Sequence, residues 1–288
     1  MPTSRAMPTT PTADILAAAD QLLEPARFDD YCVNGLQVSG PEHVHTIATG
    51  VSAHAELFRL AAQADAQLLL VHHGLFWGSG VRAIDATLKR RLQLLFDADL
   101  ALAAYHLPLD AHPQLGNNAL LAKALGATAL TPFALHHGQP IGFIATLAPG
   151  EGGTPGAGGT PESGNAHGDD NARSNADGLP AQDLFARVRQ ITQREPLIFD
   201  AGPARVRRLA IVSGGGTDYT PDAAAAGADA LLTGEPSERS MAQAREARIH
   251  LIAAGHHATE TFGVRALGEH LAERFGVRHV FLDVPNPV

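Results

Sequence analysis

Cysteine is almost absent from this chain, which has only Cys32 among its 288 residues. No disulfide can form within the chain, and this fits a reducing compartment. Residues 1–12 hold no apolar stretch like that of a signal peptide, and no later run approaches the ~20 apolar residues of a membrane span. We therefore expect a cytoplasmic protein with no membrane partner.

Basic residues are also few: Lys and Arg total 21 against 30 Asp and Glu, for a net charge of −9. An acidic chain lacks the electrostatic attraction that supports general nucleic-acid binding or adhesion to anionic membranes. The two short basic clusters, at 89–91 and 205–208, are interpreted as solvated surface. We therefore expect no general nucleic-acid binding.

Aromatic residues make up only 5% of the chain, with 3 Tyr and 1 Trp, whereas histidine occurs 15 times. Histidine is the commonest metal ligand and the side chain that titrates nearest neutrality. Three adjacent pairs occur, at 72–73, 136–137 and 256–257. The histidines are therefore the first candidates for functional residues.

The order of apolar segments predicts an α/β fold, and 45% apolar residues are enough for a substantial core. Short apolar runs that predict buried strands alternate with segments whose apolar residues recur at helical spacing. This alternation is typical of a largely parallel sheet covered by helices. The expected strands are 47–51, 68–71, 100–104, 141–147, 196–199, 209–212, 230–232, 250–254 and 280–284. The expected helices are one capped by Thr12, 53–64, 83–97, 183–191, one beginning at Thr220, 237–248 and one ending before Gly276.

Three parts are expected: a first α/β half over 1–130, a small middle subdomain over 131–205 and a second α/β half over 206–288. Within the middle part, residues 149–180 hold 9 of the 29 glycines and 4 of the 19 prolines, and Leu179 is their only large apolar side chain. Such a segment buries too little surface to offset its ordering entropy, so we predict that it is disordered. An active-site lid is the alternative.

The two halves contain a repeat. Residues 103–110 and 253–260 both match Ala-Ala-x-His-x-x-x-acid, and each follows the same order of strands and helices. The repeat supplies His106 and Asp110 in the first half and His256 and Glu260 in the second. The sequence thus predicts two similar α/β halves with matching polar groups.

Polar residues gather where the predicted strands end. His72 and His73 follow one strand, and the two repeat motifs follow two others. Ligands of open α/β sheets bind outside the carboxyl ends of strands, so these groups can converge on one cleft. Imidazole and carboxylate together suit Zn, Fe or Mn better than Ca. The alternatives are a helix-face pair for His256 and Glu260 and a turn residue for Asp110.

His136 and His137 are assigned no metal role, because they fall in an expected loop without an acidic companion. Glu235, at the end of a predicted strand, is expected to line the cleft. The glycines after Ser213 offer backbone N–H groups for a phosphate, or form a plain strand-to-helix turn.

At these motifs the chain resembles the Nif-three-like family, also known as GTP cyclohydrolase type 2 homologs or dinuclear-metal-centre hexameric proteins. The resemblance covers nearly the whole chain outside 149–180. The matching stretches are 34–38, 71–78, 105–113 with 116–118, 233–235 and 255–260.

The resemblance implies five metal ligands, with His72 and Asp110 on one ion, His73 and His256 on the other, and Glu260 bridging both. It also implies a three-layer α/β/α protomer, a homo-hexameric ring and water attack on the guanine ring of GTP.

A two-metal site activates water and clamps substrate oxygens, so a hydrolase acting on a nucleotide or phosphorylated small molecule is expected. His106 and His257 adjoin the expected ligands and are candidate proton carriers or supporting residues. A non-catalytic metal-binding ring or scaffold is the alternative function.

Overall fold

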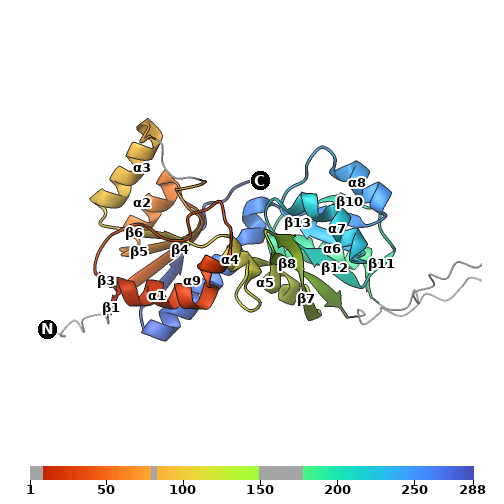
Figure 1. Ribbon diagram of the computed structural model, residues 1–288, viewed down its shortest axis with the longest axis horizontal. Helices are drawn as coiled ribbons and strands as arrows, with labels where there is room; N and C mark the ends of the chain where they lie inside the picture. The colour runs from red at the N-terminus through yellow and green to blue at the C-terminus, as the bar shows by residue number, and fades with distance from the viewer. Residues whose placement is uncertain (1–8, 79–82, 149–177) are drawn as a thin grey trace, which may run out of the picture.

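The computed structural model describes residues 9–78, 83–148 and 178–288. Two lobes lie side by side, each built on one β-sheet (Figure 1). The long helix α9 (His256–Phe275) starts at the waist between the lobes and runs beneath the first sheet. The α/β prediction is confirmed.

The first lobe is built on a five-stranded sheet with the order β15-β4-β5-β6-β2. Its strands are parallel except β2, which pairs antiparallel with β6 at one edge. The strands are β2 (Gly35–Val38), β4 (Thr46–Ser52), β5 (Leu68–His73), β6 (Ala101–Ala104) and β15 (Arg278–Phe281).

Helices cover both faces of the first sheet. The helices α1 (Thr12–Leu23) and α9 bury their apolar residues with β4, β5 and β6 on one face. The helices α2 (Ala55–Gln63) and α3 (Ala86–Asp97) pack on the other. Asp85 caps α3, because its Oδ1 accepts a hydrogen bond of 2.7 Å from the backbone N–H of Leu88. The result is an α/β/α sandwich.

The second lobe is built on a six-stranded sheet with the order β10-β14-β13-β12-β8-β7. Its central strands β12, β13 and β14 are parallel, and β8, β7 and β10 add to its edges in antiparallel fashion. The strands are β7 (Ala127–His136), β8 (Gln139–Leu147), β10 (Leu197–Phe199), β12 (Arg208–Ile211), β13 (Ala230–Thr233) and β14 (His250–Ala253).

This sheet is also covered on both faces. The helices α5 (Asn117–Ala124) and α6 (Ala181–Thr192) pack on one side, and α7 (Thr220–Ala225) and α8 (Ser240–Ala247) on the other. The short elements are β1 (Thr10–Pro11), η1 (Pro25–Arg27), β3 (His43–Val44), α4 (Leu107–Ala111), β9 (Leu179–Pro180), β11 (Arg205–Val206) and η2 (Gly216–Tyr219).

The expected boundaries between the parts differ from the observed sheets. The hairpin β7–β8 adds to the edge of β12, so part of the expected middle subdomain belongs to the second sheet. The last strand, β15, returns to the first sheet because α9 carries the chain back across the waist. Segment order along the chain predicted the elements but not which sheet each joins.

Most of the Gly- and Pro-rich segment, residues 149–177, lies outside the described residues. The prediction of disorder is wrong for its end, where Leu179 is fully buried and β9 pairs with β11. Leu179 is the one large apolar residue of that segment, and its burial accounts for the structured end.

No helix in the described part of the chain is long and apolar enough to span a bilayer.

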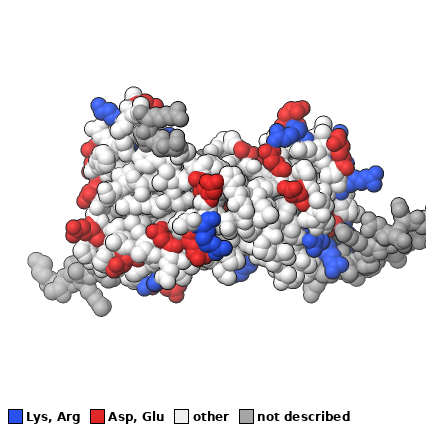
Figure 2. Space-filling model, viewed as in Figure 1, with Lys and Arg blue, Asp and Glu red and all other residues white. Residues whose placement is uncertain are grey.

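On the face shown in Figure 2, the Lys and Arg side chains drawn in blue are scattered among acidic ones rather than gathered in a patch.

Candidate metal centre

Five histidine and carboxylate side chains meet at the waist between the lobes. His72 and His73 end β5, and Asp110 lies in the short helix α4 that follows β6. His256 and Glu260 occupy the first turns of α9. We call these five residues the waist cluster.

Glu260 is the centre of the waist cluster. Its Oε1 lies 3.5 Å from His72 Nε2 and 3.2 Å from His256 Nε2, and its Oε2 lies 3.1 Å from His73 Nε2. Asp110 Oδ2 lies 3.5 Å from His72 Nε2 on the far side. One carboxylate therefore faces three imidazoles with both of its oxygens.

Each cluster imidazole is held through its other ring nitrogen. His72 Nδ1 lies 3.0 Å from the carbonyl oxygen of Tyr105, which can only accept, so Nδ1 donates and, when the ring is neutral, the Nε2 lone pair faces the cluster. His73 Nδ1 contacts Ser52 Oγ at 3.0 Å, and His256 Nδ1 lies 3.4 Å from Glu235. Such outer contacts are typical of metal-binding histidines.

Asp110 is oriented by polar groups of the second lobe. Its Oδ1 accepts hydrogen bonds from Asn117 Nδ2 at 2.8 Å and Ser213 Oγ at 3.1 Å. These bonds leave Oδ2 turned toward His72. Asn117 in turn accepts from the backbone N–H of Gly263 on α9, at 2.7 Å. The hydrogen bonds that join the lobes thus also fix the cluster.

The backbone of Gly214 approaches the cluster closely. A Cβ at this position would lie 2.3 Å from Glu260 Oε1 and 2.9 Å from His256 Nε2, and the φ angle is +59°. Glycine is required here for both reasons, space and a left-handed backbone. The sequence reasoning did not find this role.

The carboxylates of the waist cluster stabilise positive charge on its histidines. Burial alone would lower the pKa of His72, but the negative charges of Asp110 and Glu260 outweigh it and raise that pKa to about 9. His256, opposed by burial in the same way, has its pKa raised to about 9 by Glu260 and Glu235. Burial raises the pKa of Glu260, yet His73 and His72 hold it well below its ordinary value.

The residues fit a metal centre. His72 Nε2 and Glu260 Oε2 are buried and lack a hydrogen-bond partner within the described residues, although an unpartnered buried polar atom is costly. Two sets of ligand atoms lie within 4.8 Å of one another: His72, His73 and His106, and His73, His256 and Glu260. Imidazole with carboxylate is a donor set for transition metals and zinc rather than calcium. The cluster thus attracts a cation and presents lone pairs to it.

A cavity of about 610 Å³ opens onto the waist cluster. Both lobes line it, since Tyr31, Trp77 and His106 come from the first lobe and Ser213, Gly216 and Tyr219 from the second. A larger cavity, of about 830 Å³, lies elsewhere along α9 and is lined by none of the five cluster residues. The smaller cavity is therefore the candidate substrate site.

The family model for Duf34/NIF3 (NGG1p interacting factor 3) matches residues 11–287. The chain belongs to the Duf34/NIF3 family. A Pseudomonas aeruginosa relative named GTP cyclohydrolase 1 type 2 homolog is 42% identical over 273 residues, 95% of this chain and 97% of the relative. A Vibrio cholerae relative with the same name is 40% identical over 274 residues, 94% of this chain and 97% of the relative. The crystal structure of TTHA1606 from Thermus thermophilus is 34% identical, with a TM-score of 0.80 over 97% of this chain and 100% of that one.

This member of the Duf34/NIF3 family brings together all five residues named as ligands, and it adds a residue that sequence reasoning missed. Asp30 Oδ1 accepts a hydrogen bond of 2.9 Å from His106 Nδ1, and its Oδ2 accepts from the backbone N–H of Leu107 at 3.0 Å. Burial raises the pKa of Asp30, but the hydrogen bond and charge of His106 outweigh it and hold that pKa at about 2. Asp30 lies in a loop without periodic pattern, 76 residues from its partner, so no local signal marks it.

The two histidines proposed as proton carriers lie in different places. His106 lines the 610 Å³ cavity, and its ring lies 4.9 Å from that of His72 between centroids. His257 does not line that cavity, because its Nε2 pairs with Asp283 Oδ1 at 2.9 Å on another side of α9. The structure thus places His106 at the candidate site and His257 outside it.

The pair at 136–137 departs from the premises of its assignment in two respects, while the expectation that it has no metal role stays a prediction. His136 ends β7 and lines the cavity, and His137 in the hairpin turn forms an ion pair with Asp29. Glu235 lines the cavity as expected. In the loop that begins at Ser213, Gly214 N–H and Gly216 N–H donate to threonine hydroxyls, so the turn uses donors that a phosphate would need.

Proposed function

We propose that this chain is a dinuclear-metal-dependent hydrolase that acts on a nucleotide or another phosphorylated small molecule. The observation that carries the proposal is the position of Glu260, whose two oxygens each face an imidazole Nε2 of the β5 histidines, at 3.1 Å and 3.5 Å. A carboxylate with ligands on both sides is suited to bridging two cations.

Each ion has its own set of side chains in this proposal. His72 and Asp110 would hold one ion, His73 and His256 would hold the other, and Glu260 would be shared. The donor types favour Zn, Fe or Mn. Two such ions, when bound, polarise substrate oxygens and lower the pKa of water.

His106 is the proposed proton acceptor. Its Nδ1 donates to Asp30, so its Nε2 is left as the acceptor beside the cluster, where a water molecule in the cavity can deliver a proton. Asp30 acts on His106 by fixing the tautomer and stabilising the protonated ring. The pair supplies proton transfer next to the expected ions.

The substrate class rests on the relatives. The Pseudomonas and Vibrio proteins are named GTP cyclohydrolase 1 type 2 homologs, and a cavity of about 610 Å³ is in the range of small-molecule sites. Hydrolysis of a purine nucleotide is therefore the reaction to test first. A homo-hexameric ring is proposed on the same family ground, and light scattering should give a mass near six protomers.

The test is a screen of metal-loaded protein against a nucleotide panel, with Glu260→Gln as the inactive control. Turnover by the original chain that the Glu260→Gln variant lacks supports the enzyme. Metal binding without turnover of any nucleotide or sugar phosphate favours the alternative, a metal-binding scaffold.

A further inference from the structure

Two exposed aromatic side chains stand beside the waist cluster. The chain has only 3 Tyr and 1 Trp, yet Tyr31 and Trp77 both line the 610 Å³ cavity with 54% and 38% of their surface exposed. Tyr and Trp are large apolar groups that are otherwise buried when a fold can use them. Because both rings are exposed at the same cavity, we expect them to contact a ligand bound there.

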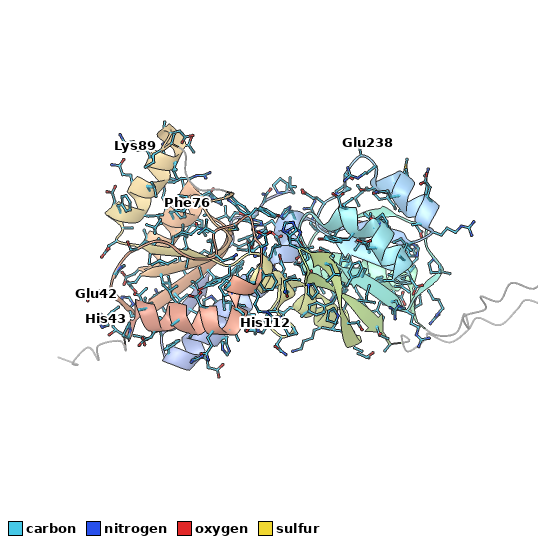
Figure 3. All side chains as sticks on the ribbon, in the orientation of Figure 1. Glu42, His43, Phe76, Lys89, His112 and Glu238 are labelled. Atoms are coloured by element: carbon cyan, nitrogen blue, oxygen red, sulfur yellow. The ribbon has the colours of Figure 1, made fainter. Side chains whose placement is uncertain are left out.

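The backbone holds these two residues together. The loops that carry them are joined by hydrogen bonds from Val33 N–H to the Phe76 carbonyl at 3.1 Å and from Gly78 N–H to the Tyr31 carbonyl at 2.6 Å. Figure 3 places Phe76 within the first lobe, and Phe76 packs against the apolar cluster to which α2 and α3 contribute. These backbone contacts therefore hold the Tyr31 and Trp77 rings in position relative to each other.

The tryptophan is oriented as well. Its indole Nε1 donates to the carbonyl of Gly74 at 2.9 Å, so the only polar atom of the ring is already bonded. What Trp77 offers to the cavity is an apolar ring surface. A ring surface without a free donor favours stacking over hydrogen-bond recognition.

The rings of Tyr31, Trp77 and His106 contact one another at inclined angles. The centroids of Tyr31 and Trp77 lie 5.6 Å apart with 32° between their planes, which is too close for a ligand between them. His106 contacts both edge-on, at 5.1 Å and 5.3 Å. A planar ligand would stack on the exposed part of the Tyr31 or Trp77 ring, next to the proposed proton acceptor.

The charges of the cavity point to the same kind of ligand. Its described lining includes Asp110, Asp218, Glu235 and Glu260 but no Lys or Arg. A polyphosphate would meet these carboxylates without a Lys or Arg side chain to pair with, and the basic groups of the lining are histidines. Apart from those histidines, the chain's own residues thus favour an uncharged planar group over a phosphate chain.

We propose that Tyr31 and Trp77 are a stacking platform that binds the heteroaromatic ring of the substrate, a nucleobase, beside the waist cluster. The proposal deepens the proposed function and rests on it for the reaction, but ring binding can be measured without turnover. It predicts that the base, rather than the phosphates, supplies most of the affinity contributed by the protein's side chains.

The probe is the protein's own fluorescence, because Trp77 is the single tryptophan. Full-length protein, both chelator-treated and zinc-loaded, is titrated with guanosine, adenosine, GTP and ribose 5-phosphate. We expect saturable quenching by the nucleosides in both forms and none by ribose 5-phosphate. Tyr31→Ala should weaken guanosine binding about 5- to 150-fold, the range of base–aromatic stacking, while Tyr31→Phe should restore it.

The control is Phe96→Ala, which removes an exposed aromatic ring from α3, outside the cavity. It should leave guanosine binding unchanged. If nucleoside binding depends on Tyr31 but no nucleotide is hydrolysed, the stacking platform is supported and the proposed hydrolase activity is contradicted.

Two results would overturn the platform. One is nucleotide turnover whose kcat/KM is the same in Tyr31→Ala. The other is a change in mass by light scattering for Tyr31→Ala with unchanged guanosine affinity. That result would make Tyr31, with the nearby exposed Val33 and Leu36, an interface between copies of the chain.

Discussion

The two lobes share a framework and use it differently at the waist. In both, three parallel strands are linked through helices in the same order, β4-α2-β5-α3-β6 and β12-α7-β13-α8-β14. The third strand of each lobe leads into a helix, α4 or α9. A histidine stands at the start of that helix, and an acidic residue follows it four positions later. At the second strand the lobes diverge, because β5 ends in His72 and His73 whereas β13 ends in Thr233 before Gly234 and Glu235.

The difference shows how two similar halves make one asymmetric centre. The glycine after β13 lets α9 come close, because a Cβ on Gly234 would lie 2.6 Å from the Cα of His256. The first lobe instead fills the equivalent space with imidazoles. Each lobe therefore supplies what the other lacks: paired histidines from one, the central carboxylate from the other.

The largest expected effect is that of replacing Glu260, the proposed ligand of both ions. In the proposed centre, Glu260→Gln would remove one negative charge from between two cations about 3.5–4 Å apart, whose repulsion a shared carboxylate would offset. We expect metal to fall at both positions, which elemental analysis per protomer would measure.

The matched control for this loss is His43→Ala. Figure 3 shows His43 at the outer end of the first lobe, away from the waist, so its replacement should leave metal content unchanged. Two ions retained in Glu260→Gln would contradict the bridging role.

Single-ligand variants should separate the halves. His72→Ala should mainly empty the position that it shares with Asp110, and His256→Ala should mainly empty the position of His73. Anomalous diffraction would locate the ion that remains in each variant. If both variants lose the same ion, the assignment of ligands to two positions is wrong.

A pH series tests whether protons and metal compete at both halves. His72 and His256 have pKa values of about 9 in the folded chain without metal, against about 6.5 for histidine in unfolded protein. Metal must displace these protons, so we expect affinity for Mn²⁺ to rise between pH 6.5 and 9, by up to about tenfold per unit for each histidine.

The same raised pKa values give an opposite trend for the metal-free protein. The charged histidines stabilise the folded state fully below pH 6.5, and this contribution is lost as pH rises through 9. The difference in Tm between loaded and metal-free protein should therefore widen from pH 6.5 to 9. A constant difference would show that metal displaces no proton from these residues.

The sequence predicted the grouping of the five waist-cluster residues better than the architecture around them. The strand-end positions of His72 and His73 and the repeated His-x-x-x-acid spacing were visible because parallel strands end at a common edge. The return of β15 to the first sheet was not visible, because nothing in an apolar run at 280–284 says which sheet it joins. β7 was missed because Pro132 and its mixed polar pattern hide a strand at a sheet edge.

The roles of the residues that support the waist cluster could not be predicted from local sequence patterns. Asp30, Asn117 and Gly214 act through distances in space between segments far apart in the chain. Their spacing along the sequence carries no period. A contact of this kind becomes visible only when the two lobes are placed together.

The smallest expected effect compares the carboxylates behind the two equivalent histidines. Asp30 is buried and bonds His106 at 2.9 Å, whereas Glu235 is 41% exposed and lies 3.4 Å from His256. Supporting partners of this kind are worth about 10–100-fold, and solvent weakens exposed ones. We expect Asp30→Asn to lower kcat about 10- to 100-fold with two ions retained, because the proposed proton acceptor loses its orientation. Glu235→Gln should weaken the affinity for metal by less than about tenfold and leave the shape of the pH–rate profile unchanged. Equal losses of metal in both variants would mean that His106 and His256 have the same role, and that the asymmetry between the lobes ends at the histidines of β5.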